Sequence, residues 1–192
     1  PASVNKVLTA AVALKTLGPG HTFKTEVSTD GTVGPDGTLT GNLYIRGLGD
    51  PTLVSEKFYR IVADLPLMGI KRIKGDVVFD DSYFDESWLI AGWGKGTDLR
   101  EGPAYFAPIT ALGVNFSTVC IVVAPGAAKN APTRAVFETP IPMLSLTNEV
   151  KTGTSRSRTR INVSRTVTGD KVHFKLTGTI KQTDAPNRIY KS

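Results

Sequence analysis

The sequence predicts an α+β fold rich in β-strand, which begins with a single helix. Three observations favour this class. Apolar residues follow helical spacing over the first 17 positions, strand-sized apolar segments dominate from Ala111 onward, and 19 Gly and 12 Pro supply many turns. With 192 residues the chain can form one domain or two small ones. The order helix, mixed segment, strands places a boundary near 107–113.

The N-terminal helix is predicted from Ser3 to Leu17, and Gly18 begins the "GPG" that ends it. Its apolar and alanine positions cover most of the helix circumference. We therefore expect this helix to be buried on most sides. The positions are Val7, Leu8, Ala10, Ala11, Leu14 and Leu17.

The mixed segment alternates strands and turns before a second helix. Strands are predicted in 21–31, in 41–47 with Leu43 and Ile45 on one face, and in 73–82. Val54, Phe58, Ile61, Val62 and Leu65 mark one face of a helix that ends near Pro66.

The remainder is predicted as nearly all strand. A buried strand over 117–126 carries the single cysteine, Cys120, which we interpret as a buried, inert thiol. A long hairpin over 156–180 turns at Gly169 and Asp170. In its first strand Arg156, Arg158 and Arg160 share one face, and Ile161 and Val163 point into the core. The last residues, "NRIYKS", complete neither helix nor strand, so we expect a fragment of a longer protein.

Composition excludes several classes of protein. A hydrophobic share of 40% and a charged share of 21% are those of a folded chain. No apolar run approaches the ~20 residues of a transmembrane segment. The net charge of +6, a modest excess spread along the chain, favours an acidic polymer or surface as partner. The arginine-rich stretch has neither interleaved aromatics nor a recognition-helix pattern, so we expect no nucleic acid partner.

Ser3 and Lys6 form the sharpest catalytic candidate. On a helix, residues three apart share a face, so the lysine amine can reach the serine hydroxyl. A neutral lysine can take the hydroxyl proton, and the helix N-terminus favours negative charge developing at Ser3. The four-residue pattern is short, and an N-cap serine followed by a solvated lysine is the alternative.

Four sequence blocks together resemble the D-alanyl-D-alanine carboxypeptidase/endopeptidase family, the class C low-molecular-mass penicillin-binding proteins. They are "PASVNKVLTAAVALKTLGPGHTFKTEV", "GNLYIRGLGDPTL", "IKGDVVFDDSYFDE" and "AYFAPITALGVN". The resemblance implies that Ser3 is acylated by the D-Ala-D-Ala of a peptidoglycan stem peptide, or by β-lactams as covalent inhibitors. It implies that Lys6 is the general base, that no cofactor or metal is needed, and that the protein is periplasmic or in the cell envelope.

The resemblance also implies a domain organisation. Residues 1–20 correspond to the active-site helix of the penicillin-binding domain, and 21–107 to a first insert domain of α/β type. Residues 108–182 correspond to a β-rich second insert nested in the first, and 183–192 to a return segment. The family's Ser-x-Asn and Lys-Thr-Gly motifs are expected downstream of the inserts. Without them we predict that the 192 residues alone do not turn over substrate.

Several other residues have a functional and a structural interpretation. By position in the family's Gly-Trp loop, Asp98 is predicted to bind the amino group of the diaminopimelate side chain, with a plain loop aspartate as the alternative. Lys151-Thr152-Gly153 is predicted to be a turn or strand end that matches the catalytic triplet by coincidence. We interpret the acids between Asp76 and Glu86 as turn aspartates rather than a cation site, and His21 and His173 as structural or exposed. Trp88 and Trp93 are expected to pack inside an insert domain rather than to form a sugar platform.

Two functions from different classes remain at this point. The first is a serine-type D-Ala-D-Ala carboxypeptidase or endopeptidase. The second is a non-catalytic binding or scaffold module of the cell envelope, in which Ser3 is incidental.

Overall fold

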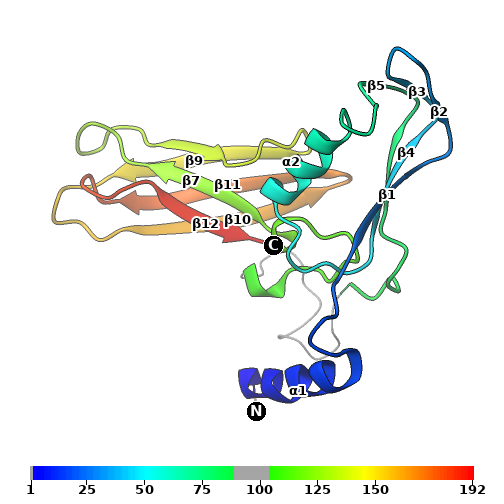
Figure 1. The fold of residues 1–192 in the computed structure, drawn as a ribbon. Helices are drawn as coiled ribbons and strands as arrows, with labels where there is room; N and C mark the ends of the chain where they lie inside the picture. Colours follow the sequence, from blue (N-terminus) through cyan, green and yellow to red (C-terminus); the bar gives the residue numbers. More distant parts are fainter. Residues whose placement is uncertain (1, 89–103) are drawn as a thin grey trace.

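The structure, a computed structural model, describes residues 2–88 and 104–192. It consists of an N-terminal helix, a first unit built on a bent three-stranded ribbon, and a second unit of two facing sheets (Figure 1). The fold is therefore mixed and rich in strand, as the sequence predicts.

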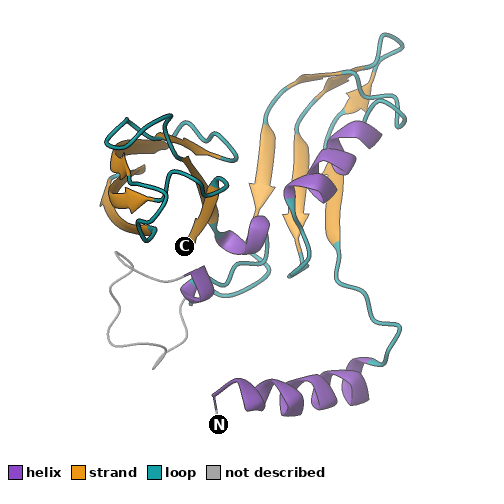
Figure 2. Ribbon diagram, turned by 90° about the vertical axis from the view of Figure 1, so that its left-hand side faces the viewer, coloured by secondary structure: helices purple, strands orange, loops and turns teal. Residues whose placement is uncertain are grey.

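The N-terminal helix forms where it is predicted, but its surroundings differ from the expectation. A short 3₁₀ turn over Ala2–Val4 leads into α1 (Asn5–Leu17), and Gly18, with φ of 80°, follows its end. None of its described side chains is buried, and Val7 and Leu8 are each 67% exposed. The prediction of a helix buried on most sides is thus wrong within the described ranges. The physical reason is that residues 18–24 carry α1 away from both units, so no described element lies against its apolar surface (Figure 2).

The first unit is a three-stranded ribbon whose strands all break at the same level. Each strand contributes one segment to each of two sheets, and the strand order is the same on both sides of the break. The sheets are β1 (Thr25–Thr29), β4 (Leu43–Gly47) and β6 (Val77–Asp80), then β2 (Thr32–Val33), β3 (Thr38–Thr40) and β5 (Arg72–Lys74). In each sheet one pair is antiparallel and the other parallel.

Glycines and an acid–amide network form the break. A Cβ on Gly31 would lie 2.1 Å from the carbonyl oxygen of Thr40, and a Cβ on Gly75 would lie 2.1 Å from that of Gly41. Asn42 donates its backbone N–H to the Asp30 carboxylate at 2.7 Å and accepts from the N–H of Asp76 at 2.9 Å. These side-chain bonds replace the ladder bonds that the break removes.

Helix α2 (Ser55–Asp64) forms where the apolar face predicts it. Phe58 contacts the first unit, with its ring centroid 6.2 Å from that of Phe79, whereas Val62 on the same face stays 49% exposed. The core of this unit is small and centres on Leu39, Leu43 and Ile70. As predicted, Leu43 and Ile45 are buried on one face of β4.

The second unit has the larger core, which two three-stranded sheets form. Their strand orders are β12-β7-β8 and β10-β11-β9. The strands are β7 (Val119–Ala124), β8 (Arg134–Phe137), β9 (Leu144–Thr152), β10 (Arg160–Thr168), β11 (Lys171–Ile180) and β12 (Asn187–Lys191). The inward faces of β7, β9 and β11 supply the buried core residues Ile121, Val123, Val150, Phe174, Leu176 and Ile180. The predicted hairpin turn at Gly169 and Asp170 joins β10 to β11 and is confirmed.

Two predictions for this unit are wrong. The final residues do complete a strand, β12, which pairs antiparallel with β7. The hairpin strand starts at Arg160, so Arg156 and Arg158 precede it, because hydroxyl bonds of Thr154 and Ser157 curl the chain into a turn. Ile161 and Val163 contact the core, as predicted.

Cys120 is half-buried rather than fully buried. Burial, followed by a hydrogen bond with Glu138, raises the pKa of its thiol. A raised pKa keeps the thiol protonated, which supports the interpretation of an unreactive cysteine. Among the helices in 2–88 and 104–192, none is long and apolar enough to cross a membrane.

Candidate active site

Ser3 and Lys6 lie together at the N-terminal end of α1. The Lys6 Nζ donates to Ser3 Oγ at 3.4 Å, which is the i, i+3 contact that the spacing predicts. Ser3 belongs to the 3₁₀ turn before α1, and the helix begins after Val4 without a side-chain cap. The alternative of an N-cap serine therefore does not describe this site.

The arrangement can support nucleophilic chemistry at a serine hydroxyl. The hydroxyl and an amine within reach of its proton lie together, next to a helix N-terminus that carries no acidic residue in its first turn and whose dipole favours negative charge. Both side chains are exposed. A lysine acts as a base only when it is neutral, a state that burial or neighbouring positive charge favours. Burial of the lysine would therefore require contacts beyond those of the described residues.

The second candidate motif, Lys151-Thr152-Gly153, is part of the second unit's framework. Thr152 ends β9, is 1% exposed, and accepts a hydrogen bond from the N–H of Gly126 at 2.8 Å. Gly153 donates its N–H to the carbonyl of Ile180 at 2.7 Å. The end of β9 lies far from α1 (Figure 1). The predicted strand end is confirmed, and the match to the catalytic triplet by coincidence stays a prediction.

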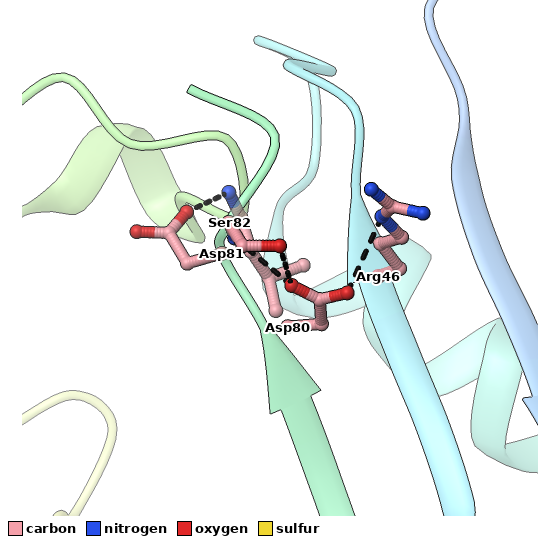
Figure 3. Close-up of polar contacts among 5 residues, drawn as sticks. Arg46, Asp80, Asp81 and Ser82 are labelled. Atoms are coloured by element: carbon pink, nitrogen blue, oxygen red, sulfur yellow. Dashed lines mark hydrogen bonds and ion pairs between the residues drawn. The ribbon is translucent and has the colours of Figure 1, made fainter. Parts of the chain in front are cut away.

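The acidic cluster at the end of β6 also has a structural explanation. Asp80 forms an ion pair with Arg46 at 3.3 Å and accepts bonds from the backbone N–H and hydroxyl of Ser82. The hydroxyl and backbone N–H of Ser82, followed by the charge of Arg46, lower the pKa of Asp80. Asp81 points the other way and accepts from the N–H of Leu112 at 2.6 Å (Figure 3).

Asp85 also has a structural explanation, because it accepts from the N–H of Ser87. The interpretation as turn aspartates is confirmed for Asp80 and Asp85. In the ranges that the structure describes, no group of three or more His, Cys, Asp or Glu side chains has the geometry of a metal site.

The other candidate residues differ in whether the structure describes them and in how exposed they are. Asp98 and Trp93 lie outside the described residues. Trp88 is 54% exposed, so the expectation that it packs inside a domain is wrong. His21 stacks edge-on against Phe23 at the surface, and His173 shares a 2.9 Å hydrogen bond with Ser145. Both histidines are structural or exposed, as expected.

Sequence reasoning missed a groove of about 1240 Å³ between α2 and the sheet of β7, β8 and β12. Apolar side chains such as Phe58, Val62 and Ile141 line it together with Tyr190. At its edge Arg188 pairs with Glu138 at 2.9 Å, and this bond lowers the pKa of the Glu138 carboxyl. No sequence signal marks the groove, because its walls come from segments far apart in the chain.

Comparison with known proteins finds a matching family model and, among similar proteins, two that are likewise named as D-Ala-D-Ala carboxypeptidases. The model of the D-Ala-D-Ala carboxypeptidase 3 (S13) family matches residues 1–191. The chain is 33% identical to a D-alanyl-D-alanine carboxypeptidase of Actinomadura sp. (strain R39) over 191 residues, which is 97% of the chain and 34% of that protein. It is 39% identical to the D-alanyl-D-alanine carboxypeptidase DacB of Haemophilus influenzae over 92 residues, or 48% of the chain and 19% of that protein.

Two solved structures share the fold. Penicillin binding protein 4 (dacB) from Haemophilus influenzae aligns over 100% of the chain and 41% of its own, with a TM-score of 0.74 and 24% identity. The same protein complexed with a novel β-lactam aligns over 100% of the chain and 39% of its own, with a TM-score of 0.66 and 22% identity. At these identities the structural likeness shows the fold alone. The chain spans about a third of the length of the Actinomadura relative.

Proposed function

We propose, from the premise that this chain belongs to the D-Ala-D-Ala carboxypeptidase 3 (S13) family, that it carries the nucleophile of a serine-type D-Ala-D-Ala carboxypeptidase or endopeptidase. The substrate is a peptidoglycan stem peptide. The observation that carries the proposal is the Lys6–Ser3 hydrogen bond at the start of α1, in a chain that the family matches from end to end.

In the proposed reaction Ser3 Oγ attacks the carbonyl carbon of the peptide bond before the terminal D-Ala. Lys6 accepts the hydroxyl proton as a new C–O bond forms. The C–N bond then breaks, the leaving amine takes up a proton, and an acyl-enzyme on Ser3 remains. Water hydrolyses this ester and returns the hydroxyl. A β-lactam would acylate the same oxygen by opening its ring, and no cofactor or metal takes part.

We extend the proposal to the domains and to the cellular location. Residues 1–20 belong to the penicillin-binding domain, 21–107 form the first insert, and the second insert begins at 108. Pairing of β12 with β7 supports placing the proposed return segment, 183–192, against the second insert rather than apart from it. A peptidase of stem peptides acts in the periplasm or cell envelope, and we propose that location. Family membership favours this peptidase over a non-catalytic scaffold.

Labelling with a fluorescent penicillin tests the proposal. The protein from the full open reading frame should gain one covalent label, located on Ser3 by mass spectrometry of peptides. Ser3→Ala should abolish the label, and Lys6→Gln should slow it by about 10²–10⁴-fold. Ser28→Ala, an exposed serine on β1, is the matched control and should label normally. Undiminished labelling of Ser3→Ala contradicts the proposal.

The isolated 192 residues should remain unlabelled under the same conditions. In their own Lys-Thr-Gly triplet, Thr152 and Gly153 are buried in the second unit's framework, which supports this expectation. In the full protein, Asp98→Asn should raise KM for peptides that end in diaminopimelate side chains more than it lowers kcat. An equal effect on peptides without that amino group would assign Asp98 to the loop's structure.

A further inference from the structure

The positive charge of this chain is concentrated in the second unit. Residues 108–192 contain 12 Lys and Arg against 4 Asp and Glu, whereas residues 1–107 contain 11 against 13. The second unit thus has a net charge of +8 and the rest −2. The expectation that the excess is spread along the chain is wrong. A net charge of this size on one unit calls for an explanation beyond solubility.

Part of this charge lies on the outer face of the β10-β11-β9 sheet and in the turn that precedes β10. Strand register places Arg160, Thr179 and Lys151 in one row across the three strands. The row two residues further along β10 contains Asn162, Thr177 and Glu149, and the next contains Ser164, Lys175 and Thr147. We call the cations of these three rows and of the adjoining turn the basic face: Lys151, Arg156, Arg158, Arg160 and Lys175.

The basic face is exposed and largely without internal counter-charge. All five of its side chains are exposed, and the opposite side of the same strands forms the core. Glu149 pairs with Lys175 at 2.8 Å, while for the other four cations no ion pair exists among the described residues. Asp184, the nearby acid, binds the Thr159 hydroxyl instead. Four cations therefore remain available to an external anion.

The uncharged polar side chains that lie between the cations indicate which kind of anion fits the basic face. Thr147, Asn162, Ser164, Thr177 and Thr179 present hydroxyl and amide groups, which match the hydroxyls of sugars. No aromatic side chain stands in these three rows to stack with a nucleobase. Strands lie about 4.8 Å apart, so Arg160 and Lys151 are separated by about 10 Å along a flat surface. Such a surface suits an extended polymer better than a small ion.

We propose that the basic face binds an extended anionic polysaccharide. The cations hold its carboxylate or phosphate groups, and the hydroxyl and amide rows bind its sugar rings. In Figure 1 the turn between β9 and β10 lies at the end of the second unit that points away from α1. Binding there leaves Ser3 free, so the polymer would hold the protein beside an anionic glycan while the site acts elsewhere. This role is independent of the proposed peptidase chemistry.

Binding of fluorescent polygalacturonate to the 192-residue chain tests the proposal, with anisotropy measured at about 50 and 150 mM salt. Substitution of Arg156, Arg158 and Arg160 by Ser should weaken binding at least about tenfold and flatten its salt dependence, because fewer counterions are released. The matched control replaces Lys24, Lys71 and Lys74, three exposed lysines of the first unit, by Ser and should bind as the unchanged chain does.

The proposal fails if the arginine variant binds normally or if the control variant loses as much affinity. It also fails if neutral dextran binds equally well. Tighter binding of single-stranded poly-dT or of phosphatidylglycerol vesicles at about 150 mM salt would replace the glycan with a nucleic acid or a membrane. If the arginine variant does not fold, Lys151→Gln with Lys175→Gln must show the same loss.

Discussion

Helix α1 and the second unit are both rich in apolar residues, yet those residues reach opposite surroundings. In the second unit, Ile121, Val123 and Leu176 are 0% exposed, because alternation along each strand directs one apolar face inward between two sheets. In α1, apolar side chains point in most directions and Val12 and Leu14 remain at least 60% exposed. A unit with one apolar face per strand completes its own core, whereas a helix apolar all round needs neighbours on several sides.

This difference bears directly on function. The second unit can hold its shape and its basic face through its own contacts. The Ser3–Lys6 pair lies at the start of a helix whose position the described residues do not fix, so the catalytic geometry proposed for the pair depends on further contacts. Four changes test the comparison, from the largest expected effect to the smallest.

Phe174→Ala should destabilise the second unit by about 3–5 kcal/mol. The ring is fully buried and meets Phe137 at a centroid distance of 5.7 Å, so its removal leaves a cavity between the sheets. Urea unfolding of the chain, followed by circular dichroism, measures the loss. A change below about 1 kcal/mol would show that the core is not tightly packed.

Thr152→Val should cost about 1–3 kcal/mol. Valine keeps the shape of threonine but cannot accept the hydrogen bond from Gly126, so that N–H loses its partner at the end of β9. The same unfolding experiment measures the cost, and Thr168→Val, at an exposed position on β10, is the control. An unchanged midpoint for Thr152→Val would mean that the triplet is not part of the framework.

Acid should loosen the first unit before the second. Hydrogen bonds from Asn42 and Tyr44 lower the pKa of Asp30, and bonds from Thr38 lower that of Asp36. A lowered pKa contributes stability that is present above the ordinary carboxyl pKa and is lost as pH falls through the folded value. Hydrogen exchange at about pH 3 and 6 should show protection lost from β1 to β6 first. Equal loss in β9 to β11 would contradict this order.

Leu8→Ala on α1 should change stability by no more than about 0.5 kcal/mol. The side chain is 67% exposed, and alanine is a stronger helix former than leucine. A loss above about 1 kcal/mol would mean that α1 packs against another part of the chain, and the comparison would then fail.

Local sequence patterns predicted elements of this fold, but they did not predict pairing between strands that are distant in sequence. The hairpin at Gly169 and the face of β4 followed from period and turn chemistry. The strand β12 was missed because its partner β7 lies more than 60 residues earlier, and nothing within "NRIYKS" marks that pairing. Arg156 and Arg158 alternate as strand residues do, but local hydroxyl bonds of Thr154 and Ser157 override the alternation.

The candidate site divides in the same way. The contact between Ser3 and Lys6 is local and follows from helical spacing, so it could be predicted. Burial of α1 depends on the elements that surround it, and its apolar residues alone do not show whether a neighbouring element is present. The groove between α2 and the second unit depends on how two units meet, which no motif records.

Because of the break in the ribbon, substitutions at three glycines that are distant in sequence should have interdependent effects on stability. Gly31 and Gly41 touch backbone to backbone, and Gly75 abuts the carbonyl of Gly41, so a methyl group on any of them pushes the neighbouring strand away. Once one alanine has opened that row, a second meets less resistance. The loss of stability from two such substitutions together should therefore be smaller than the sum of the losses from the single ones. This would be epistasis that results from backbone contact.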